Sequence, residues 1–231
     1  MTSSKWSAHG NVYLLVEEEL LTPDRARELC SAYETDGILE VLDVHGTEAE
    51  IAVWNPDGSR AELSGNGTRI AARWLAERVS ADEVRIRVGD RVTTARLAGD
   101  LVEQELGGVE VGPPEEVEGV RFVPVSVGNP HAVVQGEPAE IGSIGPLLER
   151  HSRFPAGTNV QVARVAGPGR VAARVWERGV GETQSSGTSA VAVAAATQGE
   201  GETEVIFPGG TLRVRIENGR AFLTGPAERL S

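Results

Sequence analysis

The feature of this sequence that most constrains its fold is a short motif that occurs once in each half. Ser64-Gly65-Asn66-Gly67-Thr68 precedes an apolar helical pattern in the first half, and Ser185-Ser186-Gly187-Thr188-Ser189 precedes one in the second. Around both motifs the pattern is a strand, a loop, Ser-Gly and a helix, which is typical of an α/β chain. Either motif alone is most simply a serine N-cap. The matched pair indicates two halves of the same architecture, with two helix N-termini suited to binding a carboxylate.

The remaining elements alternate in the same way. The first half has predicted strands at residues 12–16, 37–43, 50–54, 83–88, 92–97 and 101–106 and helices at 22–33 and 68–79. The second half has strands at 121–127, 131–134, 159–166, 170–176, 204–207, 212–216 and 221–224 and helices at 144–151 and 189–197. Residues 97–120 hold seven acidic side chains and no basic one, and Gly112-Pro113-Pro114 interrupts any regular element. We therefore expect domains at residues 1–112 and 113–231, and leave open a return of the last few residues to the first domain.

Charge and apolar content limit the partners. The chain has 22 Lys and Arg against 34 Asp and Glu, a formal net charge of −12, so it would repel a phosphate backbone and we expect no nucleic-acid partner. The longest apolar runs are only a few residues, so we expect no signal peptide, no membrane association and a cytoplasmic location. A single cysteine, Cys30, excludes an internal disulfide and an all-cysteine zinc site. Its position in a helical pattern predicts a buried structural thiol.

The basic and imidazole side chains argue against cofactors. The one lysine, Lys5, lies near a chain start that is expected to be flexible, which disfavours a pyridoxal phosphate Schiff base. The histidines, which are His9, His45, His131 and His151, form no i, i+4 pair and no cluster with carboxylates, which disfavours a metal site. We therefore expect no cofactor and no metal, and chemistry carried out by protein groups alone.

Six motifs, in order along the chain, carry a family resemblance. They are Asn55-Pro56-Asp57-Gly58-Ser59, Ser64-Gly65-Asn66-Gly67-Thr68-Arg69, Gly128-Asn129-Pro130-His131, Glu177-Arg178-Gly179-Val180-Gly181-Glu182-Thr183, Phe207-Pro208-Gly209-Gly210 and Thr224-Gly225-Pro226. Together they resemble the diaminopimelate epimerases over essentially the whole chain. The resemblance implies two pseudo-symmetric α/β domains, each a mixed β-sheet wrapped on a central helix, with the site in the cleft between them. A homodimer is a possible assembly.

The resemblance also implies a reaction. It is the cofactor-independent inversion of the α-carbon of LL-diaminopimelate, which gives the meso form used for lysine and peptidoglycan. The family carries a cysteine at each Ser-Gly position, one on either side of the α-carbon, whereas this chain has Ser64 and Ser186. A thiol with a pKa near ~8.5 becomes a thiolate far more readily than a hydroxyl becomes an alkoxide. The serines are either introduced or the result of natural divergence, and the sequence leaves both open.

The binding groups that the resemblance implies are retained. It places the distal ammonium and carboxylate of the amino acid against Asn11, Asn55, Asn129, Asn159 and Arg178, and the proximal carboxylate on the amides of Gly65, Asn66, Gly187 and Thr188. For each asparagine alone the simpler interpretation is a turn former, and for Arg178 alone a surface cation. Their joint presence favours a retained site for a small amino-acid substrate, with a bidentate arginine fork suited to a carboxylate.

Two side chains are candidates to take over the missing thiol chemistry. By resemblance Glu177 and His131 lie beside the two serines, and a carboxylate or imidazole shifted by burial can reach a useful pKa. The sequence therefore favours an amino-acid epimerase or racemase in which Ser64, Ser186, Glu177 and His131 carry the reaction. Two alternatives stay open: a catalytically silent relative that only binds an amino acid, and an isomerase on another substrate with Glu177 as its base.

Overall fold

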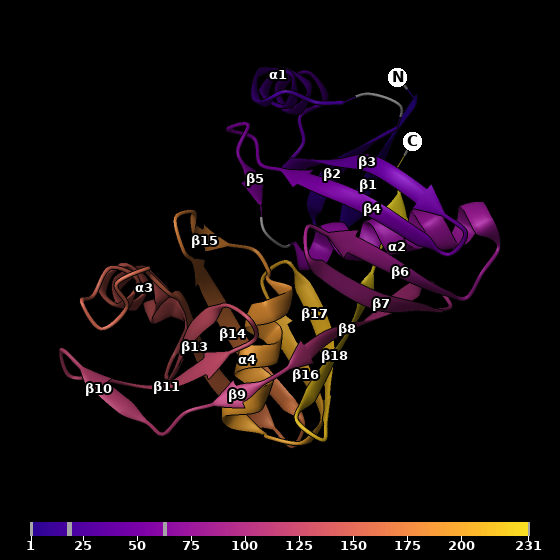
Figure 1. Ribbon diagram of the computed structural model, residues 1–231. Helices are drawn as coiled ribbons and strands as arrows, with labels where there is room; N and C mark the ends of the chain where they lie inside the picture. The colour runs from indigo at the N-terminus through magenta and orange to yellow at the C-terminus, as the bar shows by residue number, and fades with distance from the viewer. Residues whose placement is uncertain (1, 18–19, 62–63, 231) are drawn as a thin grey trace. The chain divides into compact units, whose positions relative to one another are not determined.

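The computed structural model describes residues 2–17, 20–61 and 64–230, and its contacts divide the chain into two units (Figure 1). The first unit is Met1–Gln104 together with Thr224–Ser231, and the second is Glu105–Leu223. The boundary expected between residues 112 and 113 falls within the second unit, and a division into independently folding domains at that point stays a prediction.

The first unit is a mixed sheet with a helix on each face. Its elements are β1 (Thr2–Ala8), β2 (Asn11–Glu17), α1 (Pro23–Tyr33), β3 (Gly37–His45), β4 (Glu48–Trp54), β5 (Arg60–Ala61), α2 (Gly65–Val79), β6 (Glu83–Val88), β7 (Arg91–Ala98), the start of β8 (Leu101–Gly108), and β19 (Glu228–Arg229). The pairs β2–β3 and β4–β6 are parallel, whereas β1–β2, β3–β4, β6–β7 and β7–β8 are antiparallel.

Alternation along the strands assigns the helices to opposite faces. Leu15, Leu39 and Val53 pack in one cluster with Ile70, Trp74 and Leu75 of α2, whereas Leu14, Ile38 and Ala52 pack in another with Ala26, Leu29 and Cys30 of α1. Consecutive strand residues point to opposite faces of a sheet, which explains why neighbours in sequence join different clusters. The expectation of a buried Cys30 thiol is confirmed, since that residue is 4% exposed.

The second unit repeats this topology. It contains β9 (Glu110–Val111), β10 (Glu115–Val117), β11 (Val120–Ser126), β12 (Pro130–Gln135), a 3₁₀ turn at Pro138–Glu140, α3 (Ile141–Glu149), β13 (Asn159–Gly167), β14 (Arg170–Glu177), β15 (Gly181–Thr183), α4 (Gly187–Thr197), β16 (Gly201–Phe207), β17 (Gly210–Glu217) and most of β18 (Arg220–Pro226). The pairs β12–β13 and β14–β16 are parallel and β11–β12, β13–β14 and β16–β17 antiparallel, in the same order as in the first unit. The predicted fold class, two similar α/β halves each wrapped on a central helix, is confirmed.

The central helix of the second unit, α4, is buried along most of its length. In α4 the residues from Gly187 to Ala194 are all buried, and Ala190–Ala194 pack against Val133, Val175 and Leu212 of the surrounding strands. A helix that is apolar on all sides is stable only inside a core. Its N-terminus, which begins at Gly187, is therefore held rigidly by the sheet around it.

Two expectations about the elements were wrong. Lys5 does not lie in a flexible start, because β1 pairs along its length with β2 and the Lys5 ammonium donates a 2.7 Å hydrogen bond to the carbonyl of Tyr33. Helices α2, α3 and α4 also begin earlier than predicted, at Gly65, Ile141 and Gly187. Glycine has no apolar side chain, so the spacing of apolar residues did not predict the first turns of α2 and α4.

Helix α3 offers a clean test of packing in the second unit. A Cβ at Gly145 would lie 2.7 Å from Cβ and Cγ of Trp176, whereas a Cβ at Gly142 in the same helix meets no described atom within 4 Å. We expect Gly145→Ala to lower the free energy of unfolding by about 1–3 kcal/mol because the indole must move. Gly142→Ala is the matched control and is expected to stabilise by about 0.5–1 kcal/mol. Urea midpoints of the two variants check this; equal midpoints would contradict the close approach.

Candidate functional site

Ser64 is the N-cap of α2 and forms part of a small hydroxyl pair. Its φ and ψ are −135° and 113°, and its Oγ accepts a 3.0 Å hydrogen bond from the backbone N–H of Gly67. The Tyr13 hydroxyl, from β2, lies 3.1 Å from the same Oγ. Only glycine fits at position 67, because a Cβ there would lie 2.8 Å from Leu39 Cδ2 and 3.1 Å from Ser64 Oγ. The motif thus brings the Ser64 hydroxyl close to the first amides of α2.

A buried arginine lies beneath this helix N-terminus. Arg69 is fully buried, and its guanidinium donates to the Gly65 carbonyl at 3.3 Å, to the Asn66 side-chain oxygen and to the Pro226 carbonyl at 3.5 Å. Burial lowers the pKa of Arg69 to about 10, and electrostatic interaction with Tyr13 opposes that shift. The guanidinium is therefore a cation surrounded by neutral oxygens at the base of α2.

Ser186 occupies the equivalent N-cap of α4 but has different partners. Its φ and ψ are −148° and 131°, and its side chain makes no capping bond to α4. Its hydroxyl instead interacts with the carboxyl group of Glu177, at the end of β14, and lowers the pKa of that group. The Thr183 hydroxyl, on β15, donates a 2.6 Å bond to Oε1 of the same carboxyl group. Burial raises the pKa of Glu177 despite these two interactions, which lower it. Ser186 thus lies beside a carboxyl group suited to general base chemistry.

His131 lies in the same unit with both ring nitrogens occupied. Nε2 is 2.9 Å from Oδ1 of Asn129 and Nδ1 is 3.0 Å from Nε2 of Gln161, which also donates to the Ser189 hydroxyl. One tautomer satisfies both contacts: Nε2 donates to Asn129 and Nδ1 accepts from Gln161. Burial lowers the pKa of His131 to about 3, helped by the charge of Arg178. In this arrangement the imidazole is neutral and orients Asn129.

Asn159 and Arg178 are linked through the backbone. Asn159 Oδ1 accepts from the Arg178 N–H at 3.0 Å, and its Nδ2 donates to the Pro130 carbonyl at 3.1 Å. The exposed Arg178 side chain passes over Gly157, where a Cβ would lie 3.0 Å from Arg178 Cγ and Cδ, and Nη1 donates to the Ala156 carbonyl. Asn129, His131, Asn159 and Arg178 therefore belong to one cluster, with Asn159 fixing the backbone from which the cation extends.

The remaining predicted residues are spread along the elements. Asn11 begins β2 directly after a turn in which His9 and Gly10 have φ of 51° and 79°. Asn55 donates from Nδ2 to the Ser59 hydroxyl at 2.9 Å, so its side chain stabilises its own turn. Gly65 and Asn66 open α2, and Gly187 and Thr188 open α4. A substrate-binding role for these residues stays a prediction.

Three contributors were not predicted from the sequence: Tyr13, Thr183 and Gln161. Thr183 could have been found, because the glycines at 179 and 181 indicate a hairpin that returns the chain along β14, with Glu177 opposite Gly181. Tyr13 is on the same face of β2 as Asn11, since the two are separated by one residue. Gln161 has no sequence signal of its own, because its partner His131 is 30 positions away.

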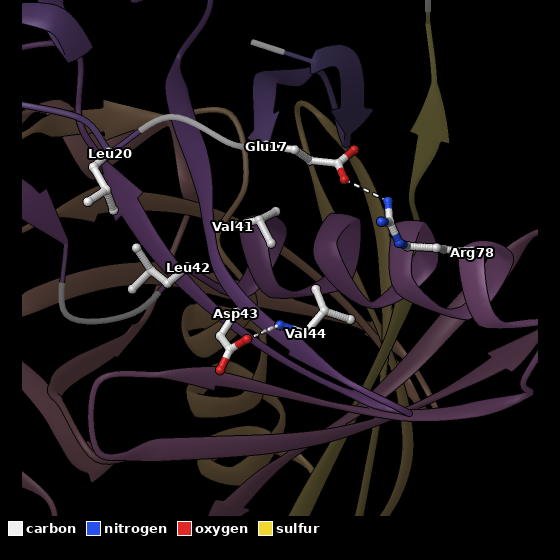
Figure 2. A pocket seen from close by; sticks show the side chains of 7 residues that line it. All are labelled: Glu17, Leu20, Val41, Leu42, Asp43, Val44 and Arg78. Carbon is white, nitrogen blue, oxygen red and sulfur yellow. Dashed lines mark hydrogen bonds and ion pairs between the residues drawn. The ribbon is translucent and has the colours of Figure 1, made fainter.

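The first unit also contains a cavity of about 380 Å³ that involves none of the predicted residues (Figure 2). Figure 2 shows it beside β3, with Leu20, Val41 and Leu42 on one side and an ion pair between Arg78 Nη1 and Glu17 Oε2, 2.6 Å apart, on the other. No group of three His, Cys, Asp or Glu among residues 2–17, 20–61 and 64–230 is arranged to hold a metal ion. Within those ranges no helix is long and apolar enough to span a membrane.

Solved structures define the class of fold. A predicted epimerase from Pseudomonas aeruginosa matches with a TM-score of 0.76 at 14% identity, over 99% of this chain and 96% of that one. A hydroxyproline epimerase from Agrobacterium vitis, solved with trans-4-hydroxy-L-proline, matches with a TM-score of 0.68 at 14% identity, over 99% and 89% of the two chains. A PhzF-family phenazine biosynthesis protein from Enterococcus faecalis gives 0.75 at 10% identity, over 99% and 96%. The chain therefore has the fold shared by these epimerase-like proteins.

Sequence relatives narrow the class to a family. The diaminopimelate epimerase of Synechocystis sp. is 33% identical over 100% of this chain and 97% of its own length, and that of Xanthomonas axonopodis pv. citri is 36% identical over 97% and 92%. The family model for diaminopimelate epimerase matches residues 123–230. The chain belongs to the diaminopimelate epimerase family. These names support an epimerase-type isomerase function.

Proposed function

We propose that this chain is a cofactor-independent amino-acid epimerase that converts LL- to meso-diaminopimelate, for lysine and peptidoglycan synthesis. The observation that carries the proposal is the half-buried Glu177 carboxyl group, which accepts a 2.6 Å hydrogen bond from the Thr183 hydroxyl and interacts with the Ser186 hydroxyl at the N-cap of α4. A serine alone is too weak an acid to replace a thiol, but a serine next to a carboxylate does not need to ionise. The acid–base capacity of this pair comes from Glu177.

Glu177 would act as the base for the α-proton. A raised pKa brings a carboxylate closer to the basicity that proton abstraction needs at neutral pH. The Ser186 and Thr183 hydroxyls hold the carboxyl group in position, so that little reorganisation accompanies the transfer. In this proposal His131 keeps Asn129 oriented rather than exchanging protons, because both of its ring nitrogens are occupied.

The helix N-termini would stabilise the charge that develops on the substrate. Removing an α-proton shifts negative charge onto the neighbouring carboxylate, where preorganised amides contribute most. The first residues of α2 and α4 supply such amides, from Gly65, Asn66, Gly187 and Thr188. Arg178 and the asparagines Asn11, Asn55, Asn129 and Asn159 would receive the distal ammonium and carboxylate of the substrate.

The same geometry supports a second candidate, an isomerase that uses Glu177 as a single base on another substrate. It is favoured by the Glu177 carboxylate beside Ser186, because a single base can remove a proton from only one face of a substrate. The third hypothesis is a protein that only binds an amino acid, and it predicts binding without proton transfer.

The test is proton exchange in heavy water. The unmodified protein is incubated with LL- and meso-diaminopimelate, and ¹H NMR follows both the loss of the α-proton signal and the appearance of the other stereoisomer. We expect loss of the α-proton with inversion. Exchange without inversion would favour the single-base isomerase, and line broadening without exchange would favour a binding protein. Absence of both would overturn the proposal for this substrate. Ser143→Ala, on the exposed side of α3, is the control variant and should exchange and invert as the unmodified protein does.

A further inference from the structure

The two serines of the repeated motif have chemically different partners, and the partner of Ser64 is a phenol. Tyr13 on β2 and Ser64 at α2 are 51 positions apart in sequence, yet their hydroxyl oxygens are 3.1 Å apart. Ser64 Oγ already accepts the Gly67 N–H, which leaves its own proton available to a further acceptor. In the second unit the matching serine interacts with the Glu177 carboxyl group instead.

The Tyr13 ring is fixed by a close contact with the neighbouring strand. Tyr13 is in register with Gly37 of β3, and a Cβ at Gly37 would lie 2.7 Å from Tyr13 Cε1. The ring therefore occupies the space that a side chain at position 37 would need. With the ring in this place, its hydroxyl lies 3.1 Å from Ser64 Oγ.

A buried cation accompanies the phenol. The guanidinium of Arg69 is fully buried, hydrogen-bonds three neutral oxygens and interacts electrostatically with Tyr13. Arg69 stabilises a negative charge that forms transiently on Tyr13. This interaction is strong because the cation is away from water.

We propose that Tyr13 is a proton-relay residue that acts through Ser64. The inference rests on the proposed epimerase function. At neutral pH a phenol, with a pKa of about 10, holds its proton, whereas a carboxyl group gives its proton up first. The Tyr13–Ser64 pair is thus the proton donor and the Glu177–Ser186 pair the proton acceptor.

The proton balance is as follows. In the proposed function Glu177 takes the α-proton, which breaks the Cα–H bond and leaves its electron pair on the substrate. The Ser64 O–H proton forms the new Cα–H bond while the Tyr13 O–H proton moves to Ser64 Oγ. The protein is left with a protonated Glu177 and a Tyr13 phenolate near Arg69. Proton exchange with solvent restores the starting state.

The test is Tyr13→Phe, which removes the hydroxyl and keeps the ring over Gly37. In heavy water we expect inversion of LL-diaminopimelate to fall by about 10²-fold or more, the typical contribution of an acid–base group. Exchange of the α-proton without inversion should persist, because Glu177 removes and returns a proton without the Tyr13 hydroxyl. The KM should change little, since the phenol does not contact the substrate in this proposal.

Matched variants separate this inference from its alternatives. Tyr33→Phe, the other tyrosine of the chain and lying on α1, should leave inversion and exchange unchanged. Ser64→Ala should give the same uncoupling as Tyr13→Phe, and the double variant should be no worse than either, because the two hydroxyls act as one unit. Inversion by Tyr13→Phe at the wild-type rate would overturn the relay and leave the epimerase proposal standing. No inversion by the unmodified protein would overturn both.

Discussion

Glu177→Gln is expected to abolish inversion and to remove the α-proton exchange that the proposed base supports. The amide has the shape of the carboxyl group and its oxygen can still accept from the Ser186 and Thr183 hydroxyls, but it cannot take up a proton. We expect the exchange rate to fall by at least about 10²-fold. Tyr13→Phe should keep this exchange, because its Glu177 carboxylate can still take up a proton.

The same substitution should stabilise the fold at neutral pH. Burial raises the pKa of Glu177 above the ordinary 4.5, so the native state binds its proton more tightly than the unfolded chain does. The stability that this group contributes is complete below the unfolded pKa and is lost as the pH rises through the folded pKa. Glutamine does not titrate, so its variant should unfold at a higher temperature at neutral pH, and the advantage should vanish below pH 4.5.

Glu182→Gln is the matched control for both measurements. Glu182 is an exposed neighbour on β15 that pairs with Arg174, with 2.6 Å between Arg174 Nε and Glu182 Oε1. An exposed pair contributes little to stability, so this variant should exchange and melt as the unmodified protein does. If Glu177→Gln exchanged at the wild-type rate, Glu177 would not be the base. If Glu177→Gln melted at the wild-type temperature at neutral pH, burial would not be the cause of the raised pKa of Glu177.

The duplicated architecture was predictable because its signals are local. Ser-Gly before an apolar run marks a helix N-terminus through capping chemistry that involves only a few neighbouring residues. An Asn-Gly pair between two strands is an equally local signal for a tight turn, and Asn218 and Gly219 do adopt positive φ, of 52° and 70°. The early helix starts at Gly65 and Gly187 were missed because glycine carries no hydrophobic signal.

The difference between the two serines could not be predicted in this way. Both lie in the same motif, and the sequence alone treats them as equivalent. Their chemistry is decided by partners from other strands, Tyr13 for Ser64 and the β14–β15 hairpin with Glu177 for Ser186. The same holds for His131, a candidate proton carrier by residue type, which burial keeps neutral by lowering its pKa to about 3. Residue identity indicated the candidates, and tertiary contacts determine their protonation.

The double substitution Ser64→Cys with Ser186→Cys is expected to raise the rate of inversion by at least about 10²-fold. A thiol with an ordinary pKa near ~8.5 forms a thiolate far more readily than serine forms an alkoxide, and a helix N-terminus favours that thiolate further. Each thiol can then take or give the α-proton directly. The rate measured is inversion of LL-diaminopimelate, with Ser185→Cys as the control. Ser185 is buried beside Ser186, so a thiol there should change nothing.

The two introduced thiols should not be equal. The sulfur at position 64 would replace an oxygen that accepts from the Gly67 N–H and lies beside the Tyr13 hydroxyl, so donors surround it and favour the thiolate. The sulfur at position 186 would face the Glu177 carboxyl group, whose charge disfavours a second anion. We therefore expect iodoacetamide to modify Ser64→Cys faster than Ser186→Cys at neutral pH. The buried Cys30 of the unmodified protein, whose pKa burial raises, is the slow reference.

The size of the rate increase decides what the serines mean. A large increase would show that the scaffold still accepts diaminopimelate in a reactive position, and that the hydroxyls limit the rate of an otherwise intact epimerase. An unchanged rate in a folded double variant, with the thiol at position 64 reactive toward iodoacetamide, would contradict this prediction. The acid–base groups would then be suited to a different substrate, because a competent thiolate next to the α2 amides would have no α-proton to remove.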